Sequence, residues 1–244
     1  MTGASSLPPP STDASVEDGF NQLLPVGYLN VLGLLIRNTG QTVDELIDWY
    51  ENIHSRNASA VWPFMNRYGR NFIRTVEEGA QPPYLVLTEF DWKSEEDKVR
   101  ARAAFQEPDT VAAMASEYAG TPPAWLQDIY SILVPVTRHQ IAGTLPALRP
   151  GGQVERRAML LRREEGVSEQ QFASAALSLA QEAAREMPGA AVILDLCHGP
   201  RASQDEPDAV LFIEGAGDQA LPRPDPRWAK VSNIFTVESR QSPI

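Results

Sequence analysis

The sequence predicts an α+β fold in which two βαββαβ units pack sheet to sheet and form a barrel. Three observations point to it. A strand, a glycine turn and the start of a helix recur in both halves of the 244-residue chain. The first half shows strand and helix patterns in the order β-α-β-β-α-β. A four-stranded sheet covered by helices on one face leaves its other face bare, so two such sheets are expected to cover each other.

The repeat relates residues 34–46 (LLIRNTGQTVDEL) to residues 160–172 (LLRREEGVSEQQF) at a constant offset of 126 positions. Both segments hold two leucines, an arginine and a glycine at matched positions. Both also contain the S/T-x-x-E/Q pattern of a helix capping box, which begins at Thr42 in the first segment and at Ser168 in the second. Two capping boxes at equivalent positions favour a duplication of the unit.

Four strands are expected in the first half, because β-branched and aromatic residues gather between turns that contain glycine or proline. They cover residues 26–37, 65–77, 84–92 and 129–141. Helices are expected where capping residues precede charged or periodic segments. They cover residues 43–56, 94–105 and 109–120. This order is that of the ferredoxin-like unit.

The second half is expected to be a degenerate copy. Its strands cover residues 154–163, 190–198, 208–216 and 230–240, and its helix covers residues 169–187. Pro222, Pro224 and Pro226 exclude a second helix, because proline lacks the N–H group and clashes with the preceding turn. The chain is thus expected to divide into a disordered tail (1–20), a first unit (21–142), a linker (143–153) and a second unit (154–244).

The composition excludes several classes of function. With 21 basic and 32 acidic residues the net charge is -11, and such a surface repels nucleic acid. The most apolar run, VGYLNVLGLLI, is too short to cross a membrane. No secretory signal pattern is present, and the one cysteine, Cys197, excludes a disulfide within the chain. A cytoplasmic protein is expected.

The first helix carries the residue that bears most on function. Leu46, Trp49 and Tyr50 belong to a stripe with helical spacing, and His54 lies one turn after Tyr50 at its edge. Two interpretations stay open for His54. It either closes the helix through favourable interaction with the final carbonyls, or it transfers protons in a site. Its equivalent in the second half is Ala180, which favours a function specific to the first half.

The second and third strands supply further candidates. Alternation places Tyr68, Arg70 and Phe72 on one face of their strand, and Trp92 on the same face as Val86. Glu89 lies among apolar residues, so it needs either an ionic partner such as Arg70 or a solvated cavity with a catalytic task. We expect Tyr68, Arg70 and Glu89 to line one cavity between the two sheets. Trp49, Phe72 and Trp92 line an aromatic pocket or simply fill the core.

A metal site is not expected. The three histidines, His54, His139 and His198, are widely separated, and the chain has no C-x-x-C pair. The glycine motifs that cradle nucleotide phosphates are also absent from the sequence.

The first half resembles the EthD family of dimeric α+β barrel proteins. The resemblance covers about residues 26–140 and rests on LGLLIRNTGQTVDELIDWYENIH, PFMNRYGRNFI and PPYLVLTEFDWKSEED. It implies a ferredoxin-like barrel with a central cavity, and for some members a cofactor-free decarboxylase or cyclase acting on aromatic polyketides. The chain lacks the second histidine of the family pattern Y-x-Q-x-H, where it has Tyr68, Arg70 and Phe72.

The resemblance implies catalytic roles for His54, Tyr68 and Glu89. From the strand and helix faces we expect Arg70, Trp49, Phe72 and Trp92 to bind the substrate. The expected protein is a cofactor-independent decarboxylase, cyclase or isomerase for an aromatic or polyketide-like molecule in secondary metabolism. One alternative is a haem-binding barrel similar to chlorite dismutase, with His198 as the candidate axial ligand. Another is a barrel that binds a small molecule without catalysis. Either a monomer or a homodimer is compatible with the sequence.

Overall fold

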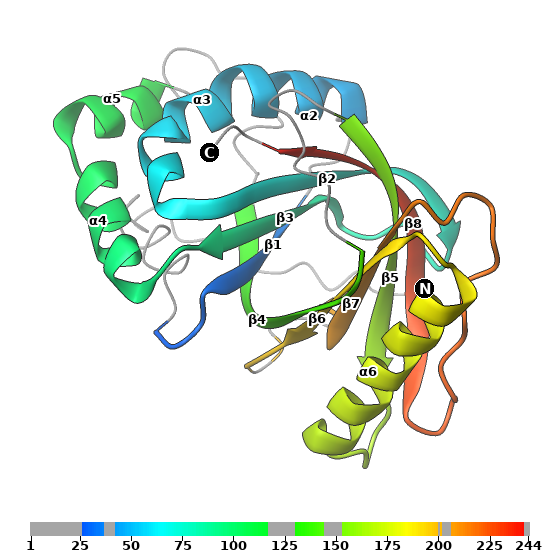
Figure 1. Ribbon diagram of the computed structural model, residues 1–244. Coiled ribbons are helices and arrows are strands. Elements are labelled where there is room, and N and C mark those ends of the chain that lie inside the picture. Colours follow the sequence, from blue (N-terminus) through cyan, green and yellow to red (C-terminus); the bar gives the residue numbers. More distant parts are fainter. Residues whose placement is uncertain are drawn as a thin grey trace, which may run out of the picture.

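The computed structural model describes residues 26–36, 42–116, 130–143, 153–199, 201 and 206–241. Within them the chain forms a closed barrel of strands in the order β1-β3-β2-β8-β5-β7-β6-β4 (Figure 1). The strands are β1 (Asn30–Ile36), β2 (Met65–Glu78), β3 (Tyr84–Trp92), β4 (Tyr130–Ala142), β5 (Gln153–Arg163), β6 (Ala191–Cys197), β7 (Ala209–Glu214) and β8 (Ala229–Gln241). Every neighbouring pair in the barrel is antiparallel.

Each half contributes four consecutive neighbours to the barrel. In the first half the order is β4-β1-β3-β2, and in the second half it is β8-β5-β7-β6. These are the same arrangement, because the first strand of each half lies between the fourth and the third. Pairing of β2 with β8 and of β4 with β6 closes the barrel. The predicted α+β barrel of two ferredoxin-like units is confirmed.

Helices cover the outside of the barrel (Figure 1). The first half supplies α2 (Val43–Trp49), a π-helical turn η1 (Tyr50–His54), α3 (Ser55–Asn57), a 3-10 segment η2 (Ala58–Phe64), α4 (Glu95–Phe105) and α5 (Pro108–Ser116). The second half supplies α6 (Glu169–Glu186). Residues 215–228, between β7 and β8, contain no helix, as the prolines predict. None of the helices in the described segments has both the length and the apolar character needed to cross a membrane.

Both predicted capping boxes are formed. Thr42 Oγ1 accepts a hydrogen bond from the Glu45 N–H at 3.2 Å, and the Glu45 carboxylate accepts the Thr42 N–H at 2.9 Å. Ser168 and Gln171 repeat this exchange at the start of α6, at 3.2 and 3.0 Å. The two helices therefore begin at positions 126 residues apart, as the repeat predicts. The duplication itself stays a prediction, as does the division into domains, since residues 1–20 and most of 143–153 lie outside the described residues.

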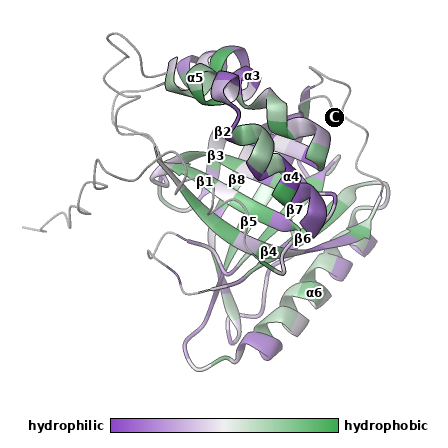
Figure 2. Ribbon diagram, turned by 90° about the vertical axis from the view of Figure 1, so that its left-hand side faces the viewer, coloured by the Kyte–Doolittle hydropathy of each residue, from purple (hydrophilic) through white to green (hydrophobic). Residues whose placement is uncertain are grey.

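Buried apolar side chains form three layers. One fills the barrel and includes Leu34, Leu160 and Phe235. A second packs α6 against the outside of the second-half strands. The third packs the first-half helices against β2 and β3. Hydrophobic residues run along the strands in Figure 2, whereas the helices mix hydrophobic and hydrophilic positions. Each strand therefore has an inner face toward the barrel and an outer face toward helices.

Candidate functional site

The structure divides the predicted site residues between the two faces of the first-half sheet. Tyr68 and Phe72 lie on the outer face, in the layer beneath the helices, and Trp49 and Trp92 belong to the same layer. Glu89 lies on the inner face, opposite Gly69 in the β2–β3 ladder. The expectation that Tyr68, Arg70 and Glu89 line one cavity is therefore wrong. Alternation along β2 points Tyr68 and Arg70 away from the barrel, whereas Glu89 points into it.

The outer-face group is organised by the π-helical turn. The predicted single helix over residues 43–56 is interrupted at Tyr50–His54, where the Ser55 N–H donates to the Tyr50 carbonyl. The wider turn leaves the His54 ring stacked on Trp49, with centroids 5.0 Å apart, and edge-on to Tyr50 at 4.9 Å. His54 is half-buried there. Short π-helical turns inside helices are rare and are frequent at functional sites.

A pair of buried tyrosine hydroxyls lies beneath this turn. The Tyr68 hydroxyl donates to the Tyr50 hydroxyl at 3.0 Å, and Thr88 Oγ1 lies 3.4 Å from Tyr50. Burial raises the pKa of both tyrosines, most strongly for Tyr68. Both hydroxyls therefore stay protonated at neutral pH and serve as hydrogen-bond donors, not as bases. Tyr50 contacts both His54 and Tyr68 and so links them.

Arg70 is held by Glu51, which belongs to the same π-helical turn. Its Nε and Nη2 donate to the two carboxylate oxygens at 2.7 and 2.8 Å, and Nη1 donates to the Tyr68 carbonyl at 3.0 Å. The guanidinium carbon lies 4.8 Å from the centre of the Tyr68 ring. Burial lowers the pKa of Arg70, but the Glu51 contacts outweigh it and the net shift is upward. Arg70 thus anchors the turn and places a fixed positive charge beside Tyr68.

Phe72 and Trp92 contribute packing to this layer. The Phe72 ring meets Tyr50 edge-on at 5.9 Å, and both Phe72 and Trp92 are fully buried. The structure therefore brings together His54, Tyr68, Arg70, Trp49, Phe72 and Trp92, and separates Glu89 from them. Sequence reasoning missed Glu51 as the partner of Arg70. The signal was weak, because an acidic residue on the outer side of a helix is ordinary.

Glu89 is the centre of a charge cluster inside the barrel. Its carboxylate lies 3.2 Å from Arg67, 2.8 Å from Arg138 and 3.1 Å from Arg156, and accepts the Asn71 side-chain N–H at 2.9 Å. Two further carboxylates bind these arginines across the strand ladders: Asp195 pairs with Arg138 and Glu214 pairs with Arg156. We call Arg67, Glu89, Arg138, Arg156, Asp195 and Glu214 the interior charge cluster.

Glu89 and Arg67 of this cluster are both ionised at neutral pH. Burial alone would raise the pKa of Glu89, but attraction to the three arginines outweighs it and holds the pKa far below its usual range. Burial lowers the pKa of Arg67 to about 10, against the attraction of Glu89, so its guanidinium stays charged at neutral pH. Gly69 gives the cluster room, because a Cβ there would lie 3.0 Å from Arg67 Nε and 3.3 Å from Glu89 Oε1. These contacts indicate a structural role for Glu89.

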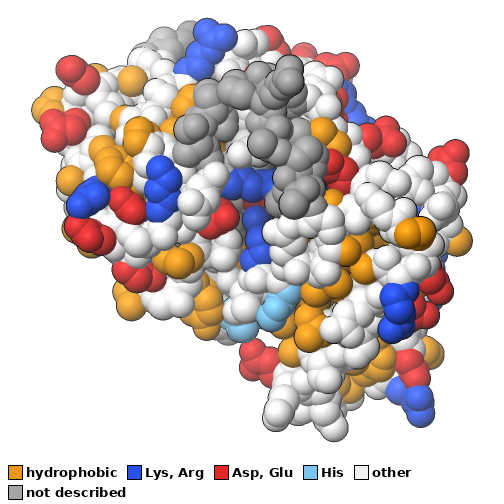
Figure 3. All heavy atoms as spheres, in the orientation of Figure 1, with side chains coloured by type: hydrophobic (Ala, Val, Ile, Leu, Met, Phe, Trp, Pro, Cys, Tyr) orange, Lys and Arg blue, Asp and Glu red, His pale blue; other side chains and the backbone are white. Residues whose placement is uncertain are grey.

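Two hollows lie elsewhere, and neither includes His54. One, of about 290 Å³, is lined by Tyr28, His198, Arg201 and residues of β4, among others. The other, of about 470 Å³, lies at the ends of β5 and β8. Figure 3 shows basic and acidic side chains together in the hollowed middle of one face, with histidine atoms at its surface. Among the described residues no group of His, Cys, Asp and Glu is arranged to hold a metal ion.

His198 does not fit the haem alternative. Its Nε2 lies 2.7 Å from Thr137 Oγ1, and its Nδ1 lies 3.5 Å from the Glu169 carboxylate. Its ring also packs on Tyr28, with centroids 5.0 Å apart. Both ring nitrogens are thus engaged with protein groups, which leaves neither directed at an axial iron position.

Comparison with known proteins does not assign the chain to a family. No protein-family model and no curated protein matches the chain. Among solved structures, an anthrone oxidase-like protein is 15% identical with a TM-score of 0.43, covering 89% of this chain and 94% of that one. A protein from Lactobacillus acidophilus suggested to be a monooxygenase is 11% identical with a TM-score of 0.44, covering 87% and 94%. Chlorite dismutase from Candidatus Nitrospira defluvii is 11% identical with a TM-score of 0.38, covering 91% and 95%.

Similarities at this level carry no argument about function. The class of protein follows from the strand order and the helix placement: an α+β barrel built from two ferredoxin-like units in one chain. The EthD resemblance stays a prediction.

Proposed function

We propose that the chain is a cofactor-independent enzyme that transfers protons on a small aromatic or polyketide-like molecule, with decarboxylation, cyclisation or isomerisation as the reaction. The observation that carries this proposal is the π-helical turn. It sets the half-buried His54 against the rings of Trp49 and Tyr50, and the Tyr50 hydroxyl in turn accepts the buried hydrogen bond from Tyr68.

In this proposal His54 is the general base or acid, because an imidazole is the side chain suited to proton exchange near neutral pH. Burial keeps both tyrosines protonated. Tyr68 donates its one hydroxyl proton to Tyr50, so the Tyr50 hydroxyl is the donor to an enolate, phenolate or carboxylate oxygen and stabilises charge that develops there. Arg70 adds a fixed positive charge without moving, since Glu51 holds it. Trp49 supplies an aromatic surface next to the imidazole. Glu89 has no part in this site.

The experiment compares two variants of His54 with a histidine control. His54→Ala and His54→Gln are both expected to lower turnover by roughly 10²- to 10⁴-fold, the usual contribution of a positioned general acid or base. His139→Ala removes a histidine from β4 and is expected to leave turnover unchanged. The assay follows α-proton exchange of aryl ketones in deuterated water and carbon dioxide release from aromatic β-keto acids, which together cover the reactions proposed.

The cost of these substitutions to stability is expected to be small, about 1 kcal/mol, as for loss of one ring contact near a helix end. A clearly less stable protein with near-normal turnover would show that His54 is scaffold.

The second candidate is a barrel that binds a small molecule without catalysis. It is favoured by the way Glu51 and the Tyr68 carbonyl occupy the Arg70 donors. It predicts that tryptophan fluorescence reports binding of aromatic acids equally in the wild type and in His54→Ala, with no proton exchange in either. A Soret absorption band in the purified protein would instead support the haem alternative, which the contacts of His198 disfavour.

A further inference from the structure

We propose that the hollow of about 470 Å³ in the second half is a binding site for a doubly charged oxyanion, such as the phosphate group of a small phosphorylated molecule. The hollow lies where β5 ends, where β8 begins and before α6 starts. Four basic side chains line it: Arg162, Arg163, Arg201 and Lys230. This site lies outside the proposed proton-transfer site and does not depend on it.

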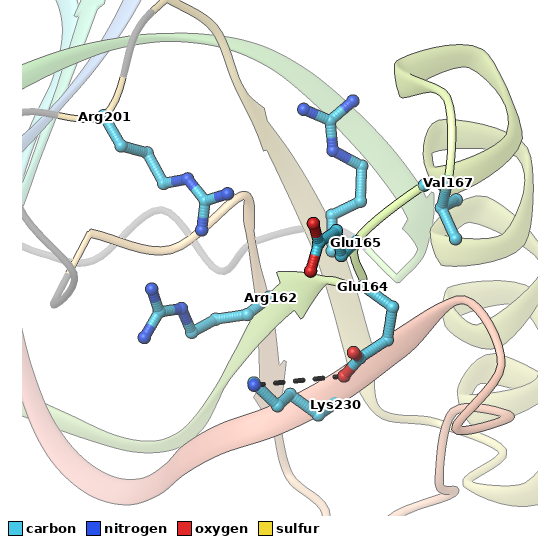
Figure 4. Close-up of a pocket in the computed structure, with 8 residues that line it drawn as sticks. Arg162, Glu164, Glu165, Val167, Arg201 and Lys230 are labelled. Carbon is cyan, nitrogen blue, oxygen red and sulfur yellow. Dashed lines mark ion pairs between the residues drawn. The ribbon is translucent and has the colours of Figure 1, made fainter.

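Three of the basic side chains come from separate segments of the second half and converge, whereas Arg163 follows Arg162 on β5 and points to the opposite face of the strand. Figure 4 shows Arg162 from β5, Arg201 from the segment after β6 and Lys230 from β8 with their charged ends on the same side of the hollow. Two acidic side chains, Glu164 and Glu165, also line it. Lys230 lies 4.0 Å from the Glu164 carboxylate, at the limit of an ion pair, and the Glu165 side chain is exposed.

Two of the four cations have no acidic partner among the described residues. Arg201 pairs with Asp208 at 3.3 Å, and Asp208 also accepts the Arg163 backbone N–H at 2.8 Å. The guanidinium groups of Arg162 and Arg163 take part in no ion pair within the described part of the chain. Arg162 Nε is in addition buried and has no hydrogen-bond partner there. A buried donor without a partner is uncommon, because it costs the desolvation of the group.

The charge selects the ligand class. Of the three converging cations, Arg162 has no acidic partner within the described segments and Lys230 lies at the limit of an ion pair with Glu164, so two positive charges face the hollow with little neutralisation. Guanidinium groups present paired donors that match the oxygens of phosphate and carboxylate. A single carboxylate would neutralise only one of the charges of Arg162 and Lys230, whereas a phosphate dianion matches both. We therefore favour a phosphate group over a monocarboxylate.

The test measures binding of inorganic phosphate and of phenyl phosphate by calorimetry at low salt, with acetate and benzoate as singly charged controls. Saturable phosphate binding, stronger than acetate binding, is expected. Stronger binding of phenyl phosphate than of inorganic phosphate would indicate an organic phosphate as the natural ligand, and equal binding would indicate the free ion. Both results support the site.

Variants locate the binding. Arg162→Gln and Lys230→Gln are each expected to weaken phosphate binding about tenfold or more, the effect of one charge-assisted hydrogen-bonding group. Lys230→Gln is the safer of the two, because Lys230 is exposed whereas Arg162 has a buried, unpartnered atom. Arg223→Gln is the matched control: it removes the same charge from an exposed ion pair with Glu78, outside the hollow, and should leave binding unchanged.

Three results would overturn the proposal. They are no phosphate binding at millimolar concentration, acetate binding as strong as phosphate binding, and phosphate binding that neither Arg162→Gln nor Lys230→Gln weakens. None of these measurements requires turnover, so failure here leaves the proton-transfer proposal standing, and loss of that proposal leaves this site untouched.

Discussion

At the scale of single residues, Glu89 shows what alternation predicts and what it leaves open. The pattern of β3 placed a carboxylate among apolar neighbours and required a partner for it, and the structure supplies three arginines. The prediction that Arg70 pairs with Glu89 is wrong. Arg70 points to the outer face, and two of the true partners, Arg138 and Arg156, are far away in sequence. Only closure of the barrel brings Arg138 and Arg156 to Glu89, and no local sequence pattern predicts which strands become neighbours.

Glu89→Gln is expected to destabilise the protein by about 3–5 kcal/mol, because it removes the shared partner of three cations, of which Arg67 and Arg156 are buried. The free energy of unfolding from urea titrations measures this. Glu96→Gln is the matched control, since Glu96 pairs with Arg100 on the exposed surface of α4. Its cost is expected to stay below about 0.5 kcal/mol. Equal effects of the two substitutions would contradict the structural role of the interior charge cluster.

Acid should weaken the same cluster. The pKa of Glu89 in the folded protein lies below that of an unfolded glutamate, which is about 4.3. Its contribution is therefore fully present above the unfolded value and is lost as pH falls toward the folded one. Unfolding free energy is expected to decline below about pH 4.3 in the wild type. Since other carboxylates such as Glu77 and Glu238 also have lowered pKa values, the diagnostic is a shallower decline in Glu89→Gln.

At the scale of elements, the positions of strands and helix starts could be predicted well from the sequence. The third strand, predicted at residues 84–92, is β3 (Tyr84–Trp92), and both capping boxes form as their side chains require. The π-helical turn could not be predicted, because Tyr50–His54 carries no residue that breaks a helix. Side chains of the turn bind residues of β2: Glu51 binds Arg70, and the Tyr50 hydroxyl accepts a hydrogen bond from Tyr68. The turn therefore depends on tertiary packing.

The capping boxes give a prediction at this scale. Ser168→Ala is expected to cost about 1 kcal/mol of stability, because the first turn of α6 loses the acceptor for the Gln171 N–H. Thr42→Ala should cost a similar amount through α2. Thermal unfolding of each variant measures the loss. Ser178→Ala, in the exposed middle of α6, is the control and should be neutral or slightly stabilising, since alanine is the better helix former. A neutral Ser168→Ala would argue against the cap.

At the scale of the whole molecule, the two halves share one barrel and cannot be treated as independent units. The sequence predicted two sheets that cover each other, and the structure joins them at β2–β8 and at β4–β6. Ion pairs cross both seams. Arg74 of β2 binds Glu238 of β8 at 2.8 Å through Nε, and Arg138 of β4 binds Asp195 of β6 at 2.6 Å. The candidate hollow for an oxyanion could not be predicted, because its cations come from β5, β8 and the segment after β6 and meet only in the folded second half.

Neither half is therefore expected to fold alone. Separated at the predicted linker, residues 21–142 would expose the edges of β2 and β4 and leave Glu89 without Arg156, while residues 154–244 would leave Asp195 without Arg138. Unpaired strand edges and a buried charge without its partner are each costly. Each fragment alone is expected to give poorly dispersed amide signals in NMR spectra. The two fragments expressed together should restore a dispersed spectrum and a cooperative melt. A well-folded first fragment by itself would show that the barrel consists of two domains that each fold independently. The interior charge cluster would then form when the two domains associate and would not be required for folding.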